Sequence, residues 1–206
     1  MKTVAKIGIT ILAIILFQTS SFGQQGSWKL APSYSVAMPM GKLKNLVNET
    51  SLRAWSVDLM YGITDKTSFG LSSGFQDFYQ RFPREVLHGE GSDISAVITN
   101  SIQVIPIMLK AKHFLSNEGK IHPFASLAAG GNLIQYQKYY GQFVDGNTKF
   151  GFAAQPELGV DVPLGKMKRL GLNLAAAYNF MPFKYNDADG LNNVAVKAGL
   201  RIPLQR

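Results

Sequence analysis

The chain of 206 residues contains no cysteine, only three histidines and only two tryptophans. The absence of cysteine excludes disulfides, thiolate catalysis and cysteine-based zinc sites. No second apolar stretch of about 20 residues follows the N-terminal one, which excludes a helical membrane protein. The net charge is +8, but Lys and Arg do not cluster on one amphipathic helix and no recognition motif accompanies them, so nucleic acid is not an expected partner. No phosphate loop or metal-ligand motif occurs, and no cofactor or metal is expected.

The N-terminus has the three parts of a secretory signal. Lys2 and Lys6 form a basic region, residues 7–17 are apolar but too short to span a bilayer, and small residues surround Gly23. We therefore expect a signal peptide over residues 1–23, cleaved after Gly23, and one mature domain over residues 24–206. An N-terminal membrane anchor is the alternative. Because no cysteine follows the cleavage site, a lipoprotein anchor is excluded.

Alternating side chains over residues 147–204 are the most informative feature of the mature chain. Apolar residues hold one parity of three successive segments: Phe150, Phe152, Ala154, Leu158, Val160, Val162; Leu170, Leu172, Leu174, Ala176, Tyr178, Phe180; and Val194, Val196, Ala198, Leu200, Ile202, Leu204. A period of two indicates strands with two unlike faces. The other parity is dominated by Gly, Ala, Asn and a few charges, which are too small and polar to form a dry core. This pattern is typical of transmembrane β-barrels, with apolar side chains outside and polar ones inside.

The same parity test gives eight strands, at about 27–38, 52–63, 67–77, 94–114, 121–135, 149–162, 169–180 and 192–204. Long loops are expected at 40–51, 78–93, 136–148 and 181–191, and short turns at 64–66, 116–120 and 163–168. Bacterial barrels have long outer loops and short periplasmic turns. Aromatic residues at strand ends suggest two girdles, the periplasmic one comprising Trp28, Tyr61, Phe69, Phe114 and Phe124. The predicted fold is an all-β, eight-stranded antiparallel up-and-down transmembrane barrel.

Three stretches carry a resemblance to a known family: residues 105–110, residues 122–125 with Gly130 and Gly131, and residues 197–204. With these the chain resembles the small eight-stranded outer-membrane barrels that include the OmpA transmembrane domain, OmpX and the PorT-like proteins. The resemblance implies a place in the outer membrane of a Gram-negative bacterium. Residues 197–204 look like the C-terminal signal read by the outer-membrane assembly machinery, although family members usually finish on an aromatic residue and this chain finishes Leu204-Gln205-Arg206.

Inward parity places charged residues in a narrow lumen. The ion-pair candidates are Glu157, Asp161, Lys197 and Arg201, and further interior groups are Lys29, Asp58, Lys110, Gln155 and Asn173. Because an isolated charge in a low-dielectric interior is costly, we expect a structural plug of ion pairs in which Lys197 or Arg201 holds Glu157. A gated ion path or a catalytic carboxylate is the alternative for the same residues.

Function is expected in the outer loops. The candidates for interaction are Tyr79, Arg81, Phe82, Tyr139 and Tyr140. Lipopolysaccharide headgroups would suit the basic side chains, and a partner protein would suit the aromatic ones. The prediction is a non-enzymatic structural, adhesion or complex-forming protein surrounded by outer-membrane lipid.

Two other classes of protein stay open. A lipid A-modifying enzyme could use Ser126, His122 and Glu157, but four residues along a strand separate Ser126 from His122 by about 13 Å, beyond hydrogen-bond reach. A soluble periplasmic ligand-binding barrel would need apolar residues inside.

Overall fold

The computed structural model describes residues 26–89, 92–140, 143–165, 170–185 and 188–204. The predicted signal peptide, residues 1–23, lies outside these ranges. Within them, no helix combines the length and apolar character needed to cross a membrane.

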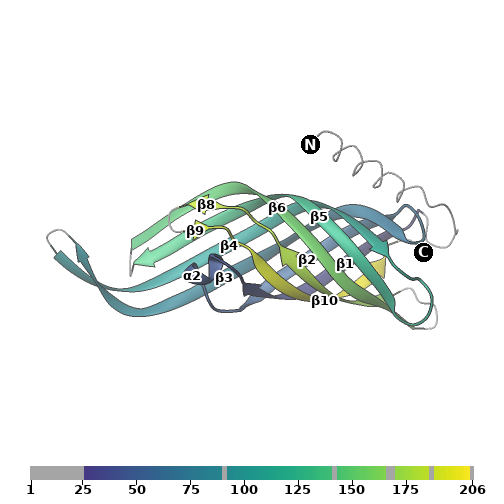
Figure 1. Ribbon diagram of the computed structural model, residues 1–206, viewed down its shortest axis with the longest axis horizontal. Coiled ribbons are helices and arrows are strands. Elements are labelled where there is room, and N and C mark those ends of the chain that lie inside the picture. The colour runs from purple at the N-terminus through teal and green to yellow at the C-terminus, as the bar shows by residue number, and fades with distance from the viewer. Residues whose placement is uncertain (1–25, 90–91, 141–142, 166–169, 186–187, 205–206) are drawn as a thin grey trace.

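Eight antiparallel strands close into a barrel in the order β1-β10-β7-β6-β5-β4-β3-β2 (Figure 1). The elements are β1 (Trp28–Pro39), α2 (Leu43–Leu46), β2 (Ser51–Gly62), β3 (Thr67–Gly89), β4 (Ser92–Phe114), β5 (His122–Tyr140), β6 (Phe143–Leu164), β7 (Leu170–Asn179), β8 (Lys184–Tyr185), β9 (Ala188–Asp189) and β10 (Asn193–Pro203). Strands β8 and β9 form a separate small hairpin. Barrel strands that are consecutive in the chain are neighbours in the ring, and β10 pairs with β7 because β8 and β9 lie outside the barrel. The pairing of β1 with β10 closes the ring.

The two faces of the strands differ as the parity of the sequence predicts. Phe150, Leu158 and Leu109 point outward with 73%, 67% and 66% of their surface exposed, whereas Glu157 and Lys197 point inward with 4% and 5% exposed. Large apolar side chains on the outside of a closed sheet are stable only against lipid, because soluble proteins rarely expose apolar patches of this extent. The wall is therefore a membrane-spanning surface.

Two predicted loops are wrong, because residues 78–93 and 136–148 belong mostly to paired strands. Tyr79 pairs with Ser101 across the β3–β4 hairpin, and Tyr139 pairs with Val144 across the β5–β6 hairpin. The polar residues that suggested loops are compatible with strands whose two faces are both in water. Ladder hydrogen bonds satisfy the backbone there without any apolar alternation.

These two hairpins continue beyond the rim of the closed ring, as Figure 1 shows. The pairing of β2 with β3 stops at Arg53 and Asp77, and the pairing of β6 with β7 ends in a bridge between Ala154 and Phe180. Beyond those points β3, β4, β5 and β6 form a four-stranded sheet, which we call the projecting sheet. No described strand covers its two outer edges.

The lumen is not polar throughout, which corrects the expectation of a wet interior. Its half near the projecting sheet holds an apolar cluster: Ala37, Leu43, Leu46, Val47, Phe78, Ile102, Val104, Met108, Ala128, Ile134, Tyr136, Ala153, Met181, Phe183, Leu191 and Ala195. Leu43 and Leu46 of helix α2, with Met181, Phe183 and Leu191 of the connection after β7, supply apolar side chains at this mouth. These residues lie in the connections between barrel strands, where no alternating pattern predicts which side chains are buried.

The end with the short turns holds a second correction. Phe114 and Phe124 are 6% and 1% exposed and lie inside the barrel, so they do not belong to the predicted lipid-facing girdle. Both residues occupy inward-facing positions in the alternation of their strands. The girdle is predicted from their position near a strand end, which does not show the face of the strand. Trp28, Tyr61 and Phe69 of the same predicted girdle do lie on the outer surface.

Candidate functional site

A buried ionic network crosses the middle of the lumen. Lys110 Nζ of β4 lies 2.6 Å from Asp58 Oδ2 of β2 and 3.0 Å from Glu157 Oε1 of β6. Lys197 Nζ of β10 lies 3.0 Å from Glu157 Oε2, and Ser126 Oγ donates to Glu157 Oε1 at 3.1 Å. Glu157 is thus the centre of the network, held by two ammonium groups and a hydroxyl. The circular arrangement of strands brings these distant residues together.

Uncharged polar side chains extend this network toward the apolar cluster. Lys197 Nζ donates to Gln155 Oε1 at 2.9 Å, and Gln155 donates to Asn179. Asn179 Nδ2 then donates to Asn193 Oδ1 at 2.6 Å, and Asn193 Nδ2 donates to Gln76 Oε1 at 3.3 Å. A chain of this kind satisfies buried donors and acceptors in sequence and fixes their side-chain positions.

Of the two cations expected to hold Glu157, Lys197 does so and Arg201 pairs with Asp161 instead. Arg201 Nε donates to Asp161 Oδ1 at 3.1 Å and to Oδ2 at 3.0 Å, while Glu157 is paired with Lys197 and Lys110. The structure therefore brings the four predicted luminal residues into two separate pairs. Lys110, which the sequence indicates only as a further interior group, makes two ion pairs, as Glu157 does. Its inward-facing position in the alternation of β4 identifies it.

An aromatic layer with a stacked cation lies between the ionic network and the short turns. Lys112 Nζ is 3.6 Å from the ring centroid of Phe124 and 4.9 Å from that of Phe114. His122 packs edge-on against Phe114 with ring centroids 6.4 Å apart. Sequence reasoning missed Lys112, although its parity matches that of Lys110.

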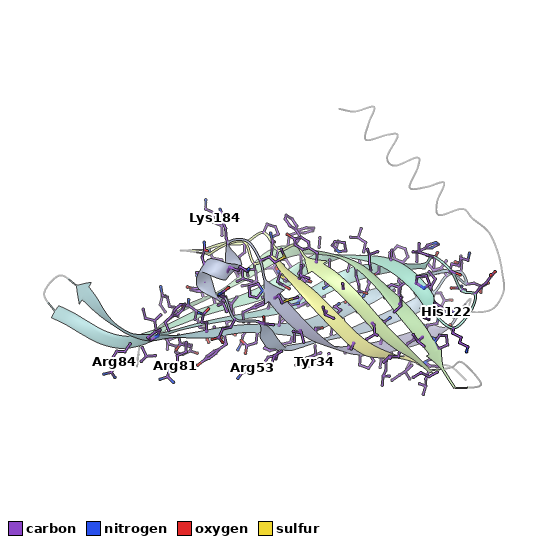
Figure 2. The ribbon with its side chains drawn as sticks, turned by 60° about the horizontal axis from the view of Figure 1, so that its bottom comes forward. Tyr34, Arg53, Arg81, Arg84, His122 and Lys184 are labelled. Carbon is purple, nitrogen blue, oxygen red and sulfur yellow. The ribbon has the colours of Figure 1, made fainter. Side chains whose placement is uncertain are left out.

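The residues considered for catalysis are not assembled as a nucleophile with its base. Ser126 donates to Glu157, but no hydrogen bond joins His122 to either residue within the described chain, and His122 Nε2 is buried without a partner. His122 lies at the end of the barrel opposite the labelled arginines (Figure 2). Among the described residues, no group of three or more His, Asp or Glu side chains could hold a metal.

The outer surface near the rim carries the predicted interaction residues together with one pair that sequence reasoning missed. Arg53 Nη1 of β2 lies 3.4 Å from Asp77 Oδ2 of β3, and its guanidinium lies 5.7 Å from the ring centroid of Tyr79. Arg81, farther along β3, is exposed, and Figure 2 shows the progression from Arg53 through Arg81 to Arg84. Outward parity across adjacent strands could have identified Arg53.

The other candidates lie on the same projecting sheet. Phe82 of β3 is half-buried, and Tyr139 of β5 is half-buried with its hydroxyl donating to Gln137 Oε1 at 2.7 Å. The backbone of Tyr140 is paired with Phe143, while its side chain lies outside the described part of the structure. All five predicted residues thus belong to strands β3 and β5 of one sheet.

Comparison with known proteins shows the fold. No protein-family model and no curated protein matches the chain. Neisserial surface protein A is similar in structure with a TM-score of 0.53 and 14% identity, over 85% of this chain and 95% of that one. OprG from Pseudomonas aeruginosa gives 0.50 and 12%, over 89% and 98%. The outer-membrane protease OmpT from Escherichia coli gives 0.47 and 8%, over 91% and 99%.

The closed ring, the apolar exterior and the likeness to Neisserial surface protein A and OprG define the class of protein. It is an eight-stranded, antiparallel outer-membrane β-barrel, which confirms the fold class predicted from the sequence. Barrels of this type reside in the outer membrane of Gram-negative bacteria, in agreement with the predicted location.

Proposed function

We propose that this barrel is a non-enzymatic binding protein of the bacterial surface that acts in adhesion or complex formation. The observation that carries the proposal is the projecting sheet. A strand needs about 9 to 11 residues to cross the membrane, whereas β3 and β4 have 23 residues each and β6 has 22. The additional length builds a surface in water that the barrel wall itself does not need.

The filled lumen supports binding over transport as the main role. An apolar cluster closes the half near the projecting sheet, and the ionic network occupies the middle. An eight-stranded barrel has an interior just wide enough for its own side chains. A molecule therefore meets this protein first on the projecting sheet, where Arg81 suits lipopolysaccharide phosphates and Tyr79 suits a protein surface.

The two free edges of the projecting sheet differ in how well they are protected. The β3 edge carries Pro83 and a register shift between Arg81 and Arg84, which are devices that discourage another strand from pairing. The β6 edge over residues 143–153 contains neither a proline nor a register shift. We infer that a partner protein adds an extended strand at β6, with main-chain hydrogen bonds supplying affinity.

The backbone of β6 defines which residues would form those bonds. Both the N–H and the C=O of Ala154 pair with Phe180 of the β7 side. Backbone groups alternate in direction along a strand, so Phe152, Phe150 and Thr148 direct theirs at the open edge. Thr148→Pro removes one outward donor and leaves the bonds to β5 intact.

Site-specific photo-crosslinking on intact cells tests the proposal. A photoreactive phenylalanine at Tyr79 or Tyr139 should give a discrete adduct with a partner, whereas the same group at Tyr61, a tyrosine of similar exposure near the short turns, should not. Loss of the Tyr139 adduct in Thr148→Pro, with retention in Thr148→Val, would support strand addition. Equal labelling at all three tyrosines, or a changed lipid A mass in cells that make the protein, would contradict a non-enzymatic surface role.

We propose further that residues 1–23 are removed on export and that the assembly machinery reads residues 197–204. Gly199 of that segment has a second use. A Cβ atom there would lie 2.5 Å from the carbonyl oxygen of Pro32 in β1, so closure of the ring itself needs a glycine at this position.

A further inference from the structure

A small cavity separates the ionic network from the aromatic layer of the lumen. Its volume is about 30 Å³, and its lining includes Lys29, Lys112, Lys197 and Arg201 together with Asp58 and Glu157. A space of this size holds about two water-sized groups. All six charged side chains come from different strands or different levels of the barrel, so only the closed ring creates the cavity.

The charges around this cavity do not balance. In the described part of the chain, the inward-facing cations are Lys29, Lys110, Lys112, Lys197 and Arg201, and the inward-facing carboxylates are Asp58, Glu157 and Asp161. Lys29 has an interaction of its own and is left out of the count. The four other cations then face three carboxylates. An uncompensated charge in an enclosed barrel is costly, so the excess needs a counterion.

Lys112 is the cation at which the imbalance is concentrated. Its ammonium lies over the rings of Phe124 and Phe114, at 3.6 and 4.9 Å from their centroids. No carboxylate oxygen of the described residues lies within ion-pair distance of it. The carboxylates that line the cavity are already engaged, because Glu157 pairs with Lys110 and Lys197, and Asp58 pairs with Lys110.

We propose that this cavity binds a small inorganic anion of the halide class, chloride under physiological conditions. Lys112 supplies the uncompensated charge, and Arg201 and Asn173, which also line the cavity, supply N–H donors. The volume of about 30 Å³ excludes larger anions such as carboxylic acids with a carbon chain. The bound anion neutralises the excess charge and joins the aromatic layer to the ionic network.

The first test measures the thermal unfolding midpoint of the purified full-length mature barrel in detergent, with sodium chloride exchanged for sodium gluconate at constant ionic strength. Gluconate is too large for the cavity. The midpoint should rise with chloride by roughly 3 °C for each tenfold increase above the dissociation constant. Lys112→Met should abolish this dependence, and Lys120→Met, which removes an exposed lysine from the turn after β4, should keep it.

The second test does not depend on the stability of a variant. Wild-type crystals soaked in bromide should give an anomalous peak in the cavity beside Lys112. A peak confined to surface lysines, or an unfolding midpoint of the wild type that is the same in chloride and gluconate, would overturn the proposal. The latter result would show that the lumen balances its charge without an anion.

Discussion

Replacement of Glu157 by Gln is the most informative perturbation of the lumen. Glu157 receives Lys110 and Lys197 at 3.0 Å each and a hydrogen bond from Ser126, and its side chain is 3% exposed. Glutamine keeps the volume and removes the charge that both ammonium groups face. Removing one partner of a buried ion pair typically costs about 3 to 5 kcal/mol, because the remaining charge is left uncompensated.

The structure divides this loss between the two lysines. Lys110 retains Asp58 at 2.6 Å, whereas Lys197 retains only the uncharged Gln155. Most of the destabilisation should therefore come from Lys197. Lys197→Met in the Glu157→Gln background should recover a large part of it, with a coupling free energy of about 0.5 to 3 kcal/mol. Arg201→Met in the same background should show little coupling, since Arg201 is paired with Asp161.

Denaturant unfolding in lipid vesicles, followed by the fluorescence of Trp28 and Trp55 on the outer surface, measures these free energies. The four proteins of each double-mutant cycle must be compared in the same lipid. A cost below about 1 kcal/mol for Glu157→Gln, or stronger coupling to Arg201 than to Lys197, would refute the reasoning. Either result would mean that the ionic network does not hold the lumen as its geometry indicates.

Three other perturbations address the wall, the strand packing and the orientation. Leu158→Arg on the lipid face should cost about 2 to 4 kcal/mol in the same vesicle assay if the side chain lies near the bilayer midplane, and full tolerance would contradict an apolar exterior in lipid. Gly70→Ala should destabilise by about 1 to 3 kcal/mol, because its Cβ would lie 1.9 Å from the carbonyl oxygen of Leu59; an unchanged unfolding curve would show that β2 and β3 can separate. Because the chain has no cysteine, Arg84→Cys should react with a membrane-impermeant maleimide on intact cells, whereas Lys66→Cys should react only after permeabilisation. The reverse pattern would invert the topology.

The pattern of side chains predicted the barrel well because a strand has a period of two and the membrane imposes one requirement on each face. Leu158 and Glu157 are neighbours in the chain, and their opposite environments follow from parity alone. The strand boundaries near the short turns also agree within a few residues, since those turns carry clear polar and glycine signals. The sequence predicts loops where the hairpins extend beyond the rim, because strands with water on both faces need no apolar alternation.

The alternation along the sequence thus determined by itself the number of barrel strands, the two unlike faces of the wall and the class of membrane. Only the tertiary structure decided that Glu157 pairs with Lys197 and Lys110 rather than with Arg201, since partners across a lumen depend on the stagger of the strands around the ring. It also decided that α2 and the side chains of Met181, Phe183 and Leu191 fill one half of the lumen, and that Phe114 and Phe124 lie inside. The alternation of side chains determines whether a residue faces the lipid or the lumen. Closure of the barrel determines its position along the barrel axis and the residues that it contacts.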